Sequence, residues 1–233
     1  MNTLASGLRV LVVQNEGASP GGLIAEWLDG EGADVDVFRI DIEDREVDPR
    51  EYELVVPLGS EFAAYEESRP FVARSRELLQ RSVEGDVPVL GVCFGGQLLA
   101  SVLGGRAFRA AESEIGWMSV RTRDPELVSE GPWFQWHFDS FTVPPGATLV
   151  AENDAGPQAF VAGRHLGVQF HPEVTPEIMD GWVRTYRHEL DDEGVDPDAL
   201  LEETRRRAEN SRRSSLRLLS RFVDRIARPG ADG

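Results

Sequence analysis

One short segment constrains this chain more than any other: residues 87–103, in which an apolar strand pattern runs into a helical pattern around a cysteine. Cys93 is the only cysteine, and Gly91 and Gly95 stand two positions before and after it. Such glycines relieve crowding in the sharp strand-to-helix turn called a nucleophile elbow. The free N–H groups that open the following helix favour thiolate over thiol. The segment predicts a nucleophilic Cys93, and the alternative is an inert core cysteine.

Strand and helix patterns alternate through the first hundred residues. We expect strands over 8–14, 33–40, 52–58 and 87–92, and helices over 22–28, 70–81 and 97–103. The fully apolar run 87–92 is typical of an interior strand of a parallel sheet. Because such a sheet must be covered on both faces, the pattern predicts a doubly wound α/β fold with its site at the strands' carboxyl ends.

Shorter segments follow, which we expect to be strands separated by turns. They cover 115–121, 133–136, 147–152, 158–162 and 165–170. These segments predict an antiparallel extension of the sheet that returns the chain to the carboxyl end near Cys93. The aromatic residues of 133–136 are compatible with core packing or with a substrate pocket.

A second constellation lies at the end of the last of these strands, where His171 is followed two residues later by Glu173. A nucleophilic thiol needs an imidazole to take its proton, and a carboxylate to hold that imidazole in one tautomer. Pro172 keeps the segment extended. We interpret the pair as base and orienting acid; the alternatives are a core histidine and a solvated carboxylate. His165 and His188 are expected to be exposed.

The two segments Gly-Val-Cys-Phe-Gly-Gly-Gln and Phe-His-Pro-Glu resemble those of the class I, triad-type glutamine amidotransferases. The resemblance covers roughly the first 190 residues and is closest to the amidotransferase domain of GMP synthase and its stand-alone relatives. It implies a flavodoxin-like fold. It also implies hydrolysis of the glutamine side-chain amide through a thioester on Cys93, with His171 and Glu173 completing the triad.

The resemblance also implies an oxyanion hole of two N–H donors. Phe94 supplies one, and Gly59 or Ser60 supplies the other, although the family's usual Gly-Gly-Pro is not kept in this turn. A flip of the loop could couple activity to a partner.

Three further residues are implied to bind the substrate. Gln97, one helical turn after Cys93, corresponds to the residue that holds the amino-acid backbone. His137 and Phe138 lie in a segment that lines the glutamine site, and Phe138 replaces the usual glycine. The replacement makes the local backbone less permissive.

The chain divides by composition into an amidotransferase domain over 1–190 and a tail over 191–233. The tail combines an acidic linker with an amphipathic helix over 199–226, and nine arginines fall between Arg205 and Arg228. This helix either packs on its own domain with its arginines solvated, or serves docking or dimerisation. Nucleic-acid binding is disfavoured, because the arginines are not regularly interleaved with aromatic residues.

Bulk composition limits the function further. A net charge of −17 disfavours binding to nucleic acid or to an anionic membrane. Residues 1–7 show no signal-like pattern and no apolar run reaches membrane-spanning length, so we expect a cytoplasmic protein. The four histidines and one cysteine lack metal-ligand spacing, so no metal is expected. All 24 basic residues are arginine, which excludes a lysine Schiff base and a phosphate-binding loop; no cofactor is expected.

Three functions remain open. The first is a glutaminase that delivers ammonia to a separate acceptor synthetase or ligase. The second is a γ-glutamyl peptide hydrolase that uses the same triad, suggested by the departures at Gly59, Ser60 and Phe138. The third is a non-catalytic regulatory protein on this fold. The oligomeric state is not predicted.

Overall fold

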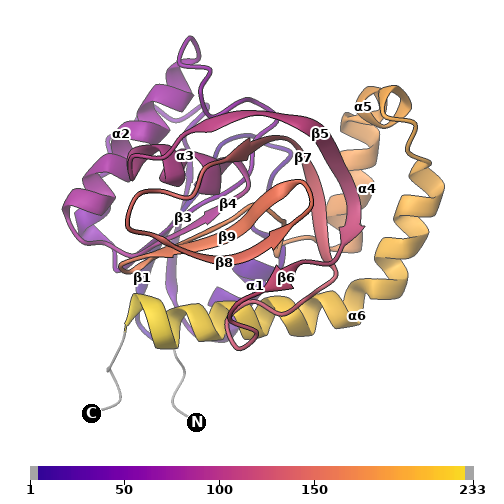
Figure 1. The fold of residues 1–233 in the computed structure, drawn as a ribbon. Coiled ribbons are helices and arrows are strands. Elements are labelled where there is room, and N and C mark those ends of the chain that lie inside the picture. Colours follow the sequence, from indigo (N-terminus) through magenta and orange to yellow (C-terminus); the bar gives the residue numbers. More distant parts are fainter. Residues whose placement is uncertain (1–4, 229–233) are drawn as a thin grey trace.

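The computed structural model describes residues 5–228, so the predictions for residues 1–4 and 229–233 lie outside the described residues. An eight-stranded sheet forms its centre, in the order β2-β1-β3-β4-β10-β9-β8-β6 (Figure 1). The parallel part contains β1 (Arg9–Gln14), β2 (Asp34–Arg39), β3 (Leu54–Pro57), β4 (Val89–Val92) and β10 (His165–Val168). Strand β4 lies between β3 and β10, as expected for a fully apolar strand.

The antiparallel extension begins where β9 (Gly156–Ala162) pairs with β10. It continues through β8 (Thr148–Asn153) and the short β6 (Arg121–Thr122). A separate two-stranded sheet joins β5 (Ala107–Met118) to β7 (Trp133–Phe141) and arches over the main sheet in Figure 1. The mostly parallel sheet and its antiparallel extension are thus confirmed, while the first half of β5 was not predicted.

Side chains of the central strands alternate between two hydrophobic cores. Val10 and Val12 face the core covered by α1 (Gly22–Gly30) and the C-terminal helix α6 (Pro197–Phe222), which continues as a π-helix over Val223–Ala227. Leu11 and Val13 face the core covered by α2 (Pro70–Glu84) and α3 (Phe94–Val102). This alternation with a period of two places helices on both faces, as the sequence predicts.

Helices α4 (Pro176–Thr185) and α5 (Arg187–Asp192) follow β10 and pack beside β7 in a third apolar cluster. The start of α4 is fixed by Thr175, whose hydroxyl accepts a hydrogen bond from the Ile178 N–H (3.2 Å), and by a proline in the first turn. Helix α4 was not predicted. It places Trp182 against the site described below.

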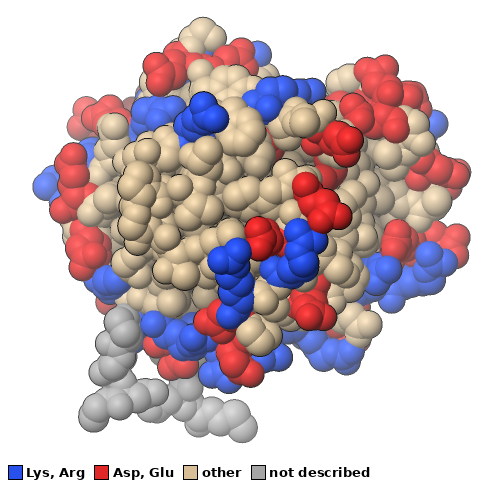
Figure 2. Space-filling model, viewed as in Figure 1, with Lys and Arg blue, Asp and Glu red and all other residues tan. Residues whose placement is uncertain are grey.

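Helix α6 packs on the body of the protein along the lower edge of Figure 1. Leu219 and Phe222 are buried in the same core as β1 and α1. Arginines and acidic residues alternate along this edge in Figure 2, and Arg225 pairs with Asp124 (2.8 Å). These contacts match the expectation of a helix packed on its own chain with arginines on the solvated face. The domain boundary near residue 190 stays a prediction.

The expectation that His165 is exposed is wrong. His165 is 5% exposed, because it begins β10 and is flanked by β4 and β9. Burial lowers the pKa of its imidazole. His188 is exposed, as expected. Within residues 5–228, no helix combines the length and apolar character that a membrane crossing requires.

Candidate active site

Cys93 occupies a strained turn between β4 and α3. Its φ of 50° and ψ of −109° lie where residues other than glycine are rarely found. The backbone N–H of Cys93 donates to the Val168 carbonyl (2.9 Å), which ties the turn to β10. A β-carbon at Gly95 would stand 2.1 Å from the Pro57 carbonyl oxygen, so only glycine fits there. The predicted elbow is therefore present, and it holds Cys93 at the carboxyl end of the parallel strands.

His171 and Glu173 form a buried pair directly after β10. The distance from His171 Nδ1 to Glu173 Oε1 is 2.7 Å, and the two residues are 5% and 1% exposed. Burial opposes a charge on the imidazole, but Glu173 and Cys93 outweigh this effect and raise the pKa of His171 well above its usual value. The carboxylate is thus placed to orient the ring through Nδ1, while Nε2 contacts the Trp136 carbonyl (3.4 Å).

Gly59 lies where the imidazole and the thiol meet. A β-carbon on Gly59 would be 3.2 Å from His171 Cε1 and 3.8 Å from the Cys93 β-carbon. Both side chains therefore lie next to the same point of the loop after β3. The structure therefore brings Cys93, His171 and Glu173 together from two separate segments, the elbow and the end of β10.

A pair of buried glutamines adjoins the thiol. Gln169 Nε2 donates to Cys93 Sγ (3.7 Å), and Gln97 Nε2 donates to Gln169 Oε1 (3.3 Å) and to the Asp139 carbonyl (3.2 Å). Gln97 lies on α3 beside the nucleophile, as predicted. Gln169 was not singled out, although it lies two residues before His171 in the same extended segment, where alternate side chains share a face.

The N–H donors predicted for an oxyanion lie at the start of α3 and in the loop after β3. Phe94 opens α3, so its N–H has no acceptor within the helix. Ser60 lines the pocket in front of Cys93, and its hydroxyl accepts from the Phe62 N–H (3.3 Å). The loop is held by Asn15, whose side chain donates to the Leu58 carbonyl (2.8 Å).

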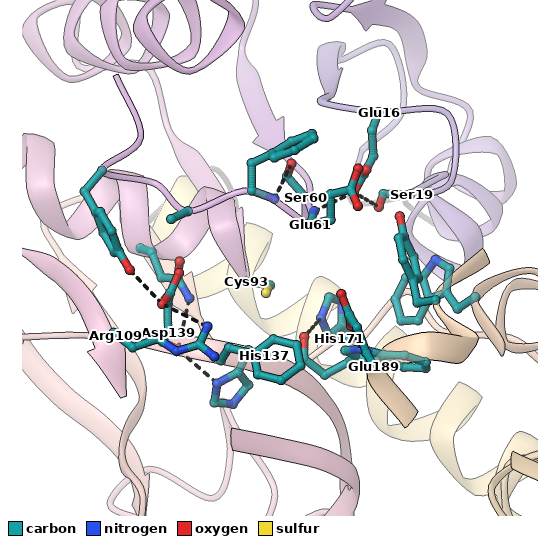
Figure 3. A pocket seen from close by; sticks show the side chains of 18 residues that line it. Glu16, Ser19, Ser60, Glu61, Cys93, Arg109, His137, Asp139, His171 and Glu189 are labelled. Carbon is teal, nitrogen blue, oxygen red and sulfur yellow. Dashed lines mark hydrogen bonds and ion pairs between the residues drawn. The ribbon is translucent and has the colours of Figure 1, made fainter. Parts of the chain in front are cut away.

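The pocket opens over Cys93 and is ringed by charged and aromatic side chains (Figure 3). Glu16, Ser19 and Glu61 lie above and beside the thiol in this view, whereas Arg109, His137 and Asp139 lie on the opposite side. The other lining residues are Ser60, Phe62, Ala63, Tyr65, Gln97, Trp136, Phe138, His171, Trp182, Tyr186 and Glu189. The nucleophile is therefore reachable by a small molecule.

Among residues 5–228, Arg109 is the only arginine that lines this pocket. Its guanidinium lies 4.8 Å from the centre of the Phe138 ring and 3.9 Å from Asp139. Sequence reasoning missed Arg109, because no local signal distinguishes it from the other arginines. Phe138, at the position where the resemblance expects glycine, thus packs under the arginine at the pocket wall.

His137 also lines the pocket, but both of its ring nitrogens face the protein. Nδ1 donates to the Asp139 carbonyl (2.9 Å), and Nε2 lies 3.1 Å from Glu114 Oε2. The ring is 5% exposed. Its position in the pocket wall matches the prediction, but Nδ1 is already hydrogen-bonded and Nε2 faces Glu114.

Carboxylates gather on the His171 side of the pocket. Burial raises the pKa of Glu16, whose carboxylate accepts from the Ser19 hydroxyl (3.0 Å) and the Glu61 N–H (2.8 Å). Burial also raises the pKa of Glu189, which accepts from the Trp136 indole (2.7 Å). These acids favour a neutral or cationic group on this side over an anion.

Comparison with known proteins decides the family. The sequence profile described as "Glutamine amidotransferase class-I" matches residues 12–183, which include the elbow, His171 and Glu173. The chain belongs to the class-I glutamine amidotransferase family. The match covers both halves of the site and all of the parallel sheet except the first three residues of β1.

Solved glutamine amidotransferases share the whole fold. One from Thermotoga maritima is 33% identical with a TM-score of 0.84, covering 93% of this chain and 98% of that one. Another from Methylobacillus flagellatus is 25% identical with a TM-score of 0.86, covering 98% and 99%. Both support the doubly wound amidotransferase fold over nearly the full chain.

Among curated proteins, the glutamine-hydrolysing GMP synthase of Thermus thermophilus is 43% identical over 109 residues. That alignment covers 42% of this chain and 22% of the synthase, so the chain matches about a fifth of the length of this relative.

Within residues 5–228, no three His, Cys, Asp or Glu side chains are grouped as metal ligands.

Proposed function

We propose that this amidotransferase hydrolyses the side-chain amide of glutamine through a thioester on Cys93. The observation that carries the proposal is that Cys93 and the hydrogen-bonded pair of His171 and Glu173 meet at one pocket. A thiol, an imidazole and an orienting carboxylate in this order are the parts that nucleophilic acyl transfer requires. The family assignment supports the same chemistry.

In the first half of the reaction, His171 has already taken the thiol proton, and the Cys93 thiolate attacks the amide carbon. The negative charge that develops on the amide oxygen is stabilised by the Phe94 N–H and by a second N–H from Gly59 or Ser60. Each such donor contributes about 3–4 kcal/mol of transition-state stabilisation in other enzymes. The carbon–nitrogen bond then breaks, and His171 returns the proton to the departing ammonia.

In the second half, His171 takes a proton from water, and the hydroxide attacks the γ-glutamyl thioester. The carbon–sulfur bond breaks, glutamate leaves, and the Cys93–His171 pair is restored. Glu173 keeps the ring in one orientation throughout, since its carboxylate is bonded to Nδ1. The raised pKa of His171 supports an imidazolium that pairs with the thiolate before attack.

The glutamine amino-acid end is proposed to bind on the opposite side of the pocket. Arg109 offers its guanidinium to the α-carboxylate, and Gln97 offers its side-chain amide next to the nucleophile. Charge supports this orientation, because the carboxylates Glu16, Glu61 and Glu189 line the other side, whereas Asp139 on this side is paired with Arg109.

Ammonia made in this way is proposed to serve an acceptor synthetase or ligase that is a separate polypeptide. The Thermus thermophilus relative is named a glutamine-hydrolysing GMP synthase, and this chain matches only a fifth of it. Hydrolysis of γ-glutamyl peptides is the second candidate. The pocket extends past His171 to Ser19 and Tyr186, which gives room for a leaving group larger than ammonia.

The test is release of glutamate and ammonia from glutamine by the purified protein, with γ-glutamyl dipeptides measured in parallel. Cys93-dependent turnover of glutamine supports the first candidate, and turnover of dipeptides alone supports the second. If neither compound is hydrolysed, with or without an ammonia-accepting synthetase, the proposal is wrong. Full biological activity of Cys93→Ala would instead support a regulatory role.

A further inference from the structure

Beneath the pocket, β5 and β7 carry a second buried Glu–His pair that the triad does not use. Glu114 and His137 are direct partners in the ladder between the two strands, and each is 5% exposed. Glu114 Oε2 lies 3.1 Å from His137 Nε2, an ion-pair contact rather than an aligned hydrogen bond. The pairing register shifts between Arg109 and Glu114, so one stretch of β5 sends Arg109 to the pocket and Glu114 beneath it.

The contacts of the pair fix the role of each ring nitrogen. A carbonyl oxygen only accepts hydrogen bonds, so the contact of His137 Nδ1 with the Asp139 carbonyl (2.9 Å) places a hydrogen on Nδ1. Nε2 then faces the Glu114 carboxylate. Burial raises the pKa of Glu114, but His137 and the amides of Asn153 and Gln158 outweigh burial and lower it.

From this pair, a continuous series of polar contacts leads to the nucleophile. The Asp139 carbonyl accepts from both His137 Nδ1 and Gln97 Nε2. Gln97 in turn donates to Gln169, which donates to Cys93 Sγ. The far end is fixed by amides, since Asn153 (2.6 Å) and Gln158 (2.8 Å) both donate to Glu114. A shift of His137 would therefore move the Asp139 carbonyl, which accepts a hydrogen bond from Gln97.

We propose that Glu114 is a positioning residue. Through His137 and the Asp139 carbonyl, it holds Gln97 in the orientation that binds the amino-acid end of glutamine. This inference rests on the proposed function. A role in stability alone does not account for the pair, because buried ion pairs contribute little net stability compared with apolar residues of similar volume. Fixed geometry at a binding site is what such a pair supplies.

The test is Glu114→Gln, which keeps the size of the side chain and removes its charge. The KM for glutamine should rise about tenfold with kcat within about twofold, a coupling in the range measured between contacting residues. In a His137→Asn background, the asparagine amide can still donate to the Asp139 carbonyl. There, Glu114→Gln should raise the KM for glutamine by less than about twofold. Glu114→Asp, which keeps the charge but shortens the side chain, should show an intermediate KM.

An unchanged KM in Glu114→Gln, or full additivity with His137→Asn, would overturn the inference. A fall in kcat with an unchanged KM would overturn it as well, because the positioning of Gln97 acts on binding. If Glu114→Gln does not fold, the same comparison is made with Glu114→Asp, and a wild-type KM in that variant counts against the proposal.

A second readout separates this inference from the proposed function. A diazoketone analogue of glutamine alkylates a cysteine only after binding as glutamine does, whereas iodoacetamide needs no such site. Wild-type protein that shows no preference for the analogue would contradict the proposed function itself. Wild-type preference that persists undiminished in Glu114→Gln would overturn the positioning role alone. The expected result is a loss of analogue reactivity with unchanged reactivity toward iodoacetamide.

Discussion

Gly59 and His171 face each other so closely that a β-carbon on residue 59 would stand 3.2 Å from the imidazole Cε1. The loop after β3 therefore sets the position of the base as well as supplying a candidate oxyanion donor. The imidazole is also hydrogen-bonded to Glu173 at 2.7 Å, so a larger side chain at position 59 would strain this hydrogen bond. This relationship makes position 59 a sensitive probe of the site.

Gly59→Ala should lower kcat for glutamine by about tenfold or more, since a displacement of about 1 Å in an active site can cost 10²-fold. Steady-state kinetics with thermal unfolding checks this expectation. Gly181→Ala is the matched control, because Gly181 lies in α4 with no atom near its added methyl. The control should keep wild-type kcat and gain roughly 0.5–1 kcal/mol of stability. Equal kcat in both variants would contradict the role given to Gly59.

Glu173→Gln should weaken the base. An ordinary histidine has a pKa near 6.5. The pKa of His171 is raised in the folded protein, so its charged form persists to higher pH. Its ion-pair contribution to stability is fully present below about pH 6.5 and is lost as pH rises through the raised value. Removing the carboxylate charge lowers that pKa and shifts this loss to lower pH.

The measurement for Glu173→Gln is the rate of Cys93 alkylation by iodoacetamide across pH, together with kcat. Near neutral pH the variant should alkylate more slowly, because less thiolate–imidazolium pair is present, and kcat should fall by roughly 10²-fold or more. An alkylation profile that overlays that of the wild type would show that Glu173 does not control the protonation of His171.

Arg109→Gln should raise the KM for glutamine with a smaller change in kcat. Charged hydrogen bonds contribute about 1.5–3 kcal/mol, so a rise of about tenfold or more is expected. Arg106→Gln is the matched control, since Arg106 directly precedes β5 and does not line the pocket. Binding of glutamate by calorimetry gives an independent check. If Arg109→Gln binds glutamate as tightly as the wild type, the α-carboxylate lies elsewhere.

Phe222→Ala should destabilise the whole protein by about 3–5 kcal/mol, because its ring is buried in the core shared with the sheet. Arg225→Ala, three residues further on, removes a partly exposed ion pair with Asp124 and should cost less than about 1 kcal/mol. Urea unfolding of both variants distinguishes the apolar face of the helix from its charged face. Similar losses in the two variants would contradict this division.

The elements near the site were predictable where local sequence specifies them. The turn at Cys93 requires glycine on both sides for steric reasons, and the apolar strands around it allow only an interior position in a parallel sheet. His171 and Glu173 are two residues apart in an extended segment, so their contact is local. These features needed no knowledge of the rest of the chain.

The remaining features depend on contacts between distant segments. His165 is buried because β10 is inserted between β4 and β9, which a turn preceding it does not reveal. Glu114, Arg109 and Gln169 belong to the site only because β5, β7 and the end of β10 meet there. A chain with 41 acidic residues and 24 arginines offers no local signal for choosing among them.

The most direct test of the central claim is to trap the covalent intermediate. Protein mixed with glutamine and quenched in acid during turnover should carry one γ-glutamyl group, located on the peptide that contains Cys93, by mass spectrometry. Wild-type protein should show the adduct and release glutamate, and Cys93→Ala should do neither. Glutamate release that continues in Cys93→Ala, or turnover with no adduct on Cys93 under any quench, would contradict the account.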